Sequence, residues 1–314
     1  MTPITLGEFE ITRVFFAIVL LLVSAHLFGY VVQRFAGIPK VIGEIVGGLV
    51  LGPTGLGFFF PSVYLWIFQA FASEGQLISI LYWIGLVLLM FLSGFEIQKS
   101  VNRDDWKLVF AILIGATAIP FCVGWLTPLY YDFSPFMGAR GTLLSLTIVI
   151  AIAISVTSIP VISRIFIDLG ILHTRFSKIV LATATIEDVI LWVALAVATG
   201  LADGHAISLA SIVSKVLATL LFFVAALIVF PKIFVFLNQS RFNLFIKSSA
   251  TGYVLLTCFL FAAIASILHV NIIFGAFLAG IVVGKTSDET MARVKVHITE
   301  ISLGFFIPIY FAVV

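Results

Sequence analysis

Ten apolar segments follow one another along this chain of 314 residues, and they constrain its fold more than any other feature. Most approach or exceed the roughly 20 residues that an α-helix needs to cross the hydrocarbon core of a bilayer. We place them at 11–32, 41–60, 77–97, 108–130, 142–165, 176–201, 207–236, 246–268, 271–284 and 298–314. The connections are too short to hold a folded soluble domain. The sequence therefore predicts one all-α polytopic membrane domain over residues 1–314.

The composition agrees with a membrane protein and excludes other classes. Hydrophobic residues make up 62% of the chain and charged residues 10%, whereas soluble domains have about 45–50% and about 25%. A soluble globular enzyme is therefore excluded, and membrane lipid is the expected surrounding. The net charge of +2 is too small to indicate a nucleic-acid partner.

The basic residues predict an orientation in the membrane. Of the 17 Lys and Arg residues, all but Arg13, Arg140 and Lys215 fall in the odd-numbered connections, and this count places Arg164 in the fifth. Cytoplasmic loops are enriched in Lys and Arg. We therefore expect a multi-pass protein of the cell (inner) membrane with its N-terminus outside.

An internal repeat relates the second and ninth segments. Residues 41–53 read VIGEIVGGLVLGP and residues 273–285 read IFGAFLAGIVVGK, with glycines at the same spacing: Gly43, Gly48 and Gly52 match Gly275, Gly280 and Gly284. Segments seven apart cross the membrane in opposite directions, and inverted repeats are typical of secondary transporters. The plainer alternative is that close helix packing favours glycine in both places. Continuing the repeat predicts about three further helices after residue 314, so that the chain holds about 10 of 13.

Two adjacent acids, Glu187 and Asp188, lie near the middle of the sixth segment. A charged side chain there costs about 2.5–3.5 kcal/mol on insertion scales and is a functional candidate by default. The hydroxyl of Thr185 lies three residues before Asp188, on the same helix face. Such a pair can exchange protons for a cation. The alternative is a structural pair that is hydrogen-bonded or neutralised from another helix, although no segment has a Lys or Arg at its centre.

The fifth segment contains a predicted helix break. Ser155, Thr157 and Ser158 precede Pro160, and proline inside a helix removes a hydrogen bond and clashes with the preceding turn. An unwound stretch whose carbonyl and hydroxyl oxygens bind a small cation is one interpretation. A simple proline kink with hydroxyls bonded back to carbonyls is the other.

Two further acids, Glu44 and Glu96, are candidates for gating or for structural ion pairs. No zinc-protease, phosphate-loop or serine-hydrolase motif occurs, and no cofactor is expected. An intramembrane aspartyl protease would need a second central aspartate on another helix, and the ten segments have none.

Five stretches of the sequence are informative together: IPKVIGEIVGGLVLGPTGLG, LLMFLSGFEI, the TSIP break, ATATIEDVILWVALA and NIIFGAFLAGIVVG. They resemble the monovalent cation:proton antiporter-2 family. That family includes sodium/proton antiporters and the membrane part of Kef-type potassium efflux systems. The resemblance implies an inverted-repeat fold of 13 helices with broken crossing helices. It also implies a homodimer and transport by alternating access. A C-terminal regulatory domain outside this chain is a further expectation.

On the family motif, Asp188 matches the aspartate that binds cation and proton in competition, and Glu187 stands where relatives have Asp, Asn or Gln. Thr157 and Ser158 fall in the first broken helix. We therefore expect exchange of Na⁺ or K⁺ for H⁺, with Asp188 binding the alkali cation and Glu187, Thr157, Ser158, Ser155 and Thr185 as further ion-site candidates. The alternative is a gated cation channel or an ion sensor on the same fold.

Overall fold

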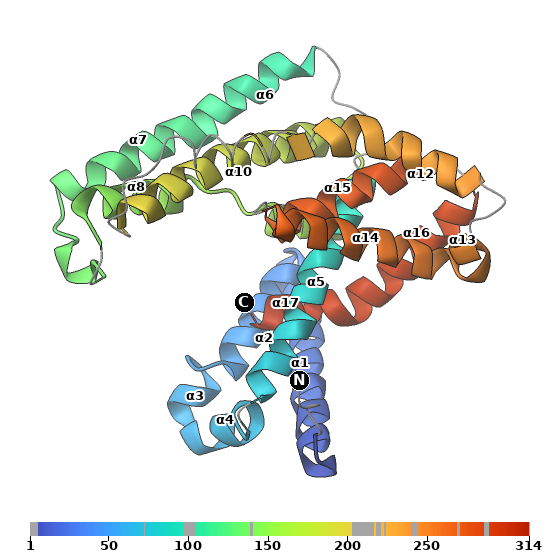
Figure 1. The fold of residues 1–314 in the computed structure, drawn as a ribbon. Coiled ribbons are helices and arrows are strands. Elements are labelled where there is room, and N and C mark those ends of the chain that lie inside the picture. The colour runs from blue at the N-terminus through green and yellow to red at the C-terminus, as the bar shows by residue number, and fades with distance from the viewer. Residues whose placement is uncertain are drawn as a thin grey trace.

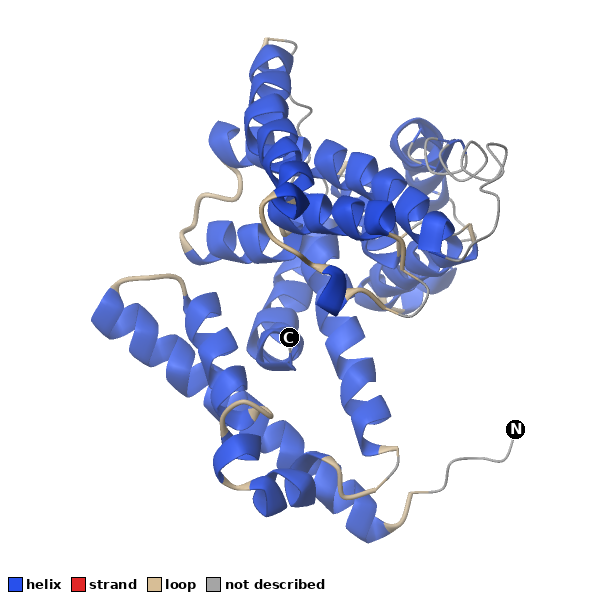
Figure 2. Ribbon diagram, turned by 90° about the vertical axis from the view of Figure 1, so that its left-hand side faces the viewer, coloured by secondary structure: helices blue, strands red, loops and turns tan. Residues whose placement is uncertain are grey.

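The computed structural model describes residues 6–71, 73–96, 104–138, 141–202, 217, 221–222, 224–239, 244–268, 271–285 and 289–313. All regular secondary structure in these ranges is helical (Figure 2). The helices are α1 (Glu8–Val31), α2 (Lys40–Leu51), α3 (Leu56–Phe59), α4 (Pro61–Phe68), α5 (Glu74–Glu96), α6 (Asp105–Leu113), α7 (Ile119–Leu126), α8 (Leu143–Ser155), α9 (Ile159–Asp168), α10 (Arg175–Ala202), α12 (Phe230–Gln239), α13 (Leu244–Ser248), α14 (Ala250–Ile267), α15 (Ile272–Gly284), α16 (Glu289–Ile301) and α17 (Ile307–Val313).

Four π-helical turns adjoin or join these helices: η1 (Val32–Ala36) after α1, η2 (Ile114–Ala118) between α6 and α7, η5 (Ala225–Val229) before α12 and η6 (Ser302–Phe306) between α16 and α17. A π-turn replaces the i→i+4 hydrogen bond of the α-helix by an i→i+5 bond and is frequent at functional sites.

The described residues contain seven helices that are long and apolar enough to cross a membrane. They correspond to the first five, the eighth and the tenth predicted segments, and α10 and α15 cover the sixth and ninth. Much of the seventh segment lies outside the described residues. The prediction of an all-helical polytopic membrane protein is confirmed, while the total of 13 helices stays a prediction.

The helices form two groups (Figure 1). In the first, which we call the main bundle, α1 packs on α2, both contact α17, and α5 packs on α15 and α17, with α14 against α15. In the second, the outer layer, α8 contacts α7 and α10, and α10 contacts α6. Helix α9 contacts α2 and α5 on one side and α10 on the other, so it joins the two groups.

Helix α5 is the centre of the main bundle because its second half is buried on every side. Residues 86–92 are all buried there, and Phe91 and Phe95 pack edge to face with their ring centroids 5.8 Å apart. Burial all round is what a helix surrounded by other helices requires. The residues of α5 therefore set how closely its neighbours can approach.

Glycines permit several close approaches between these helices. A Cβ atom at each of four glycines would lie 2.1–2.4 Å from a backbone carbonyl oxygen of a neighbouring helix, far inside van der Waals contact. Two lie in α2 and two in α15: Gly43 faces Phe28 of α1, Gly48 faces Ala312 of α17, Gly275 faces Phe261 of α14 and Gly280 faces Phe91 of α5. Close contact of helix backbones in a membrane depends on such small residues.

The position of Arg164 corrects the sequence analysis. The count of basic residues placed it in a connection, but it lies inside α9, where it is only 3% exposed. Its Nη2 atom is 2.6 Å from Oε1 of Glu44 in α2. A charged residue can be buried in an apolar helix when an acid from another helix pairs with it, and sequence hydropathy does not report that pairing.

Candidate functional site

The predicted helix break is present between α8 and α9. Helix α8 ends at Ser155, residues 156–158 are non-helical, and α9 begins at Ile159 with Pro160 in its first turn. Val156 and Ser158 have extended backbone conformations. Proline fits the first turn of a helix because no intrahelical donor is needed there, so Pro160 begins a new helix instead of kinking a continuous one.

Glu187 is tied to this break. It projects from α10, is 1% exposed, and its Oε1 atom accepts a hydrogen bond of 2.7 Å from the backbone N–H of Thr157. The break leaves backbone groups without helical partners, and the carboxylate satisfies one of them. The structure therefore brings Glu187 and Thr157 together.

Asp188, the next residue of α10, differs from Glu187. Its side chain is half-buried, and within the described part of the chain it forms no hydrogen bond or ion pair. Among the described residues, the charged group that acts on it is the adjacent Glu187. A carboxylate that is mostly removed from water and has no protein partner is unusual, and it can accept a proton or a cation without breaking an existing contact.

The hydroxyl candidates divide into two kinds. Ser155 donates to the carbonyl of Ala151 at 2.9 Å, and Thr185 donates to that of Leu181 at 2.7 Å. Their oxygen lone pairs stay available, although their protons are used. Ser158 is exposed and Thr157 half-buried at the break. Ser155, Thr157 and Ser158 therefore lie at the break, where Thr157 contacts Glu187, whereas Thr185 bonds within its own helix.

Thr117 is a residue of the site that was not predicted from the sequence, and it lies in the π-turn η2. It is 5% exposed, and its hydroxyl lies within interaction range of the Glu187 carboxylate. No motif or charge distinguishes this threonine in the sequence, because a π-turn has no reliable local signature.

The other two predicted acids lie elsewhere. Glu44 forms the buried ion pair with Arg164. Asp168 of α9 is a second acid of this cluster, because its Oδ1 lies 3.4 Å from Nε of Arg164. Its Oδ2 accepts a hydrogen bond of 3.2 Å from the Val41 N–H. This supports a structural role for Glu44. Glu96 ends α5, and its side chain lies outside the described part of the structure.

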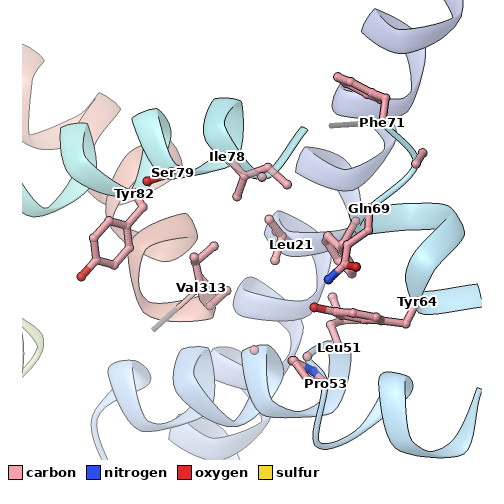
Figure 3. A pocket seen from close by; sticks show the side chains of 16 residues that line it. Leu21, Leu51, Pro53, Tyr64, Gln69, Phe71, Ile78, Ser79, Tyr82 and Val313 are labelled. Carbon is pink, nitrogen blue, oxygen red and sulfur yellow. The ribbon is translucent and has the colours of Figure 1, made fainter. Parts of the chain in front are cut away.

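A cavity of about 1040 Å³ is lined by residues of α1, α2, α4, α5 and α17 (Figure 3). Its lining includes Leu21, Tyr64, Gln69 and Tyr82, whose side chains Figure 3 shows around the opening, and neither Glu187 nor Asp188 is part of it. No group of three or more His, Cys, Asp or Glu side chains suited to a metal ion occurs among the described residues.

The family comparison decides what kind of protein this is. The family described as "Sodium/hydrogen exchanger, transmembrane" matches residues 20–314. The chain belongs to this family. The resemblance to cation:proton antiporters is thereby confirmed. The relatives of this chain are named as transporters of ions, not as enzymes.

Individual relatives cover nearly the whole chain. A K⁺/H⁺ antiporter 1 of Saccharomyces cerevisiae is 32% identical over 88% of the chain and 32% of its own length. The Na⁺/H⁺-K⁺ antiporter GerN of Bacillus cereus is 28% identical over 97% of the chain and 70% of its own length. Cation/H⁺ antiporter 18 of Arabidopsis thaliana is 26% identical over 97% of the chain. The chain spans about a third of the length of the plant and yeast relatives, with 37% of the plant protein covered.

Proposed function

We propose that this chain is the transport domain of an antiporter that exchanges Na⁺ or K⁺ for H⁺, with Asp188 as the group that binds either the cation or the proton. The observation that supports this most is the state of Asp188. It is half-buried at the centre of a membrane helix, has no hydrogen-bond or ion-pair partner among the described residues, and adjoins Glu187. Two neighbouring carboxylates repel each other when both are ionised, so a bound proton or cation stabilises the pair.

The helix break supplies the second half of the proposed site. Helix α8 ends at Ser155, so its last carbonyl groups lack helical donors, and the C-terminal end of a helix favours positive charge. Those carbonyls, the hydroxyls of Thr157 and Ser158, and the acids of α10 provide oxygen ligands, which suit alkali cations. Glu187 is held by the Thr157 N–H, so it fixes the break beside α10 while Asp188 stays free to exchange its ligand.

The glycine contacts support the proposed inverted repeat. Under the repeat, α1, α2 and α5 correspond to α14, α15 and the α16–α17 helix. Gly43 of α2 faces α1, and its counterpart Gly275 of α15 faces α14. Gly48 faces α17, and its counterpart Gly280 faces α5. Each second helix thus packs on the first helix of its own repeat and on the third helix of the other, as a two-fold relation requires. Packing of unrelated glycine-rich helices has no reason to reproduce this exchange of partners.

Such a relation is the usual basis of alternating access, in which two arrangements expose one site to either side of the membrane. We extend the proposal to this mechanism, to a cell-membrane location with the N-terminus outside, and to a homodimer. The names of the relatives include both sodium and potassium antiporters, so the cation is a matter for measurement.

The test is cation-dependent proton movement in everted vesicles that contain the protein at its full natural length. A ΔpH-sensitive dye is quenched by respiration, and Na⁺, Li⁺ and K⁺ are added in turn. We expect dequenching with at least one cation and its loss in Asp188→Asn. The matched control is Asp132→Asn, because Asp132 is a fully exposed carboxylate in the connection before α8.

Two outcomes would contradict the proposal. Exchange that is intact in Asp188→Asn would remove Asp188 from the mechanism. Cation flux that cannot be driven uphill by ΔpH alone would indicate a channel on the same fold.

A further inference from the structure

We infer that Thr117 is a further ligand residue of the ion site, whose hydroxyl oxygen binds the cation together with the acids of α10. This inference rests on the proposed function and adds a third structural element, the π-turn η2, to the break and to α10. Nothing in the sequence around Thr117 suggested such a role.

The first observation is the unpartnered hydroxyl of Thr117. The side chain is 5% exposed, and its Oγ1 atom has no hydrogen-bond partner of normal geometry among the described residues. Buried polar groups in native structures are nearly always paired, and an exception calls for a bound water or ion or for a functional reason.

The second observation is the contrast with other threonines in the helices. Six of them donate to the carbonyl four residues earlier, at 2.7–3.0 Å: Thr12, Thr127, Thr147, Thr183, Thr185 and Thr257. This bond is the ordinary way for a threonine to satisfy its hydroxyl in an apolar helix. Thr117 does not make it, because it lies in a π-turn, where the carbonyls are displaced from their α-helical positions.

The third observation is where the freed hydroxyl lies. Thr117 is within interaction range of the Glu187 carboxylate, whose Oε1 already accepts the bond from the Thr157 N–H. Turn η2 packs against α8, the helix that ends at the break. The π-turn, the break and α10, which are separate in sequence, therefore meet at the Glu187 carboxylate.

These observations favour a ligand over a purely structural threonine. A structural threonine would use its hydroxyl on its own helix, as the other six do. A hydroxyl oxygen has two lone pairs and no charge, so it can bind an alkali cation without adding to the repulsion between Glu187 and Asp188. The π-turn gives up one regular α-helical turn, and its result at Thr117 is a buried hydroxyl that is not used by its own helix.

The experiment compares Thr117→Val, which keeps the shape and removes the hydroxyl, with Thr117→Ser, which keeps the hydroxyl. The matched control is Thr147→Val, because Thr147 is a buried threonine of α8 whose hydroxyl bonds to the Leu143 carbonyl. Dequenching is measured in everted vesicles as a function of cation concentration at two pH values, and thermal stability is measured on the purified proteins.

For Thr117→Val we expect the apparent KM for the cation to rise about five- to tenfold, the effect of losing one polar contact, with the maximal rate within about twofold of wild type. Thr117→Ser should restore the KM, and Thr147→Val should leave it unchanged. Because protons and cations compete for the same acids, the apparent KM should be higher at low pH in every variant, while the fold increase in Thr117→Val should be similar at both pH values.

Either of two results would overturn the inference: an unchanged KM in a folded Thr117→Val protein, or an equal loss in Thr117→Ser, which would mean that shape and not the hydroxyl matters. If Thr117→Val does not accumulate, Thr117→Ala gives the same comparison with less bulk. The failure of the proposed function is distinguishable, because the wild type would then show no cation-dependent exchange or Asp188→Asn would retain it.

Discussion

The buried cluster of Arg164, Glu44 and Asp168 joins the main bundle to the helix that continues from the break, and its energetics can be predicted from its geometry. Arg164 has two acid partners, at 2.6 Å from Glu44 and 3.4 Å from Asp168. Glu44 has Arg164 as its ion-pair partner, and its second oxygen, Oε2, is buried without a hydrogen bond in the described structure. Removing the arginine therefore strands two acids, whereas removing Glu44 leaves the arginine paired.

The expected magnitudes follow from this asymmetry. Arg164→Met should lower the free energy of unfolding by about 3–5 kcal/mol, the cost of breaking a buried pair by deleting one partner. Glu44→Leu should cost less, about 1.5–3 kcal/mol, the range for a hydrogen bond to a charged group. The double variant should cost less than the sum of the two by about 0.5–3 kcal/mol, because the residues are in contact.

The assay is unfolding of the purified protein in mixed micelles with increasing SDS, followed by circular dichroism. Arg34→Met is the matched control, because Arg34 is an exposed arginine at the end of the first helix. Equal stability of Arg164→Met and wild type, or a greater loss in Glu44→Leu than in Arg164→Met, would refute the assignment of Arg164 as the shared partner.

The same unfolding assay tests two further predictions. Glu187→Gln should be as stable as wild type, because its amide oxygen can still accept a hydrogen bond from the Thr157 N–H. Glu187→Ala leaves that donor unpaired and should lower the free energy of unfolding by about 1–3 kcal/mol. Equal losses in the two variants would contradict the hydrogen bond. In α5, Gly94→Ala should lose about 1–3 kcal/mol through overpacking, because a Cβ there would lie 2.0 Å from the Phe277 carbonyl oxygen. Gly75→Ala in the same helix meets no atom within 4 Å and should be neutral or up to about 1 kcal/mol more stable, so a similar loss in both would reject the close helix contact.

Features with a local cause could be predicted from the sequence. The apolar segments follow from hydropathy, and the break follows from Pro160, because proline acts on the turn that contains it. The glycine pattern also predicts that α2 and α15 are related helices, because equal spacing puts the same residues on the same helix face, and this relation stays a prediction.

Features that depend on pairing across the fold could not be predicted. Arg164 lies 120 residues from Glu44 along the chain, so nothing near either residue shows that the other neutralises it. A charge near the end of an apolar segment was for that reason assigned to a connection. Thr117 was missed for a related reason: the effect of its π-turn is visible only once Glu187 of α10 is placed opposite.

The buried acids of the described structure, taken together, explain why Asp188 is different. Each of the others has a partner that stabilises its charge or its oxygen atoms: Glu44 has Arg164, Asp168 has Arg164 and the Val41 N–H, Asp105 has Arg175, Glu74 has the Ala70 N–H and Glu187 has the Thr157 N–H. Desolvating an acid without such a partner is costly. An acid that keeps a permanent partner, however, would have to break that contact in every transport cycle. Asp188 is the one half-buried acid of the described helices without such a partner, and this is why we propose it as the group that takes up and releases a cation or a proton.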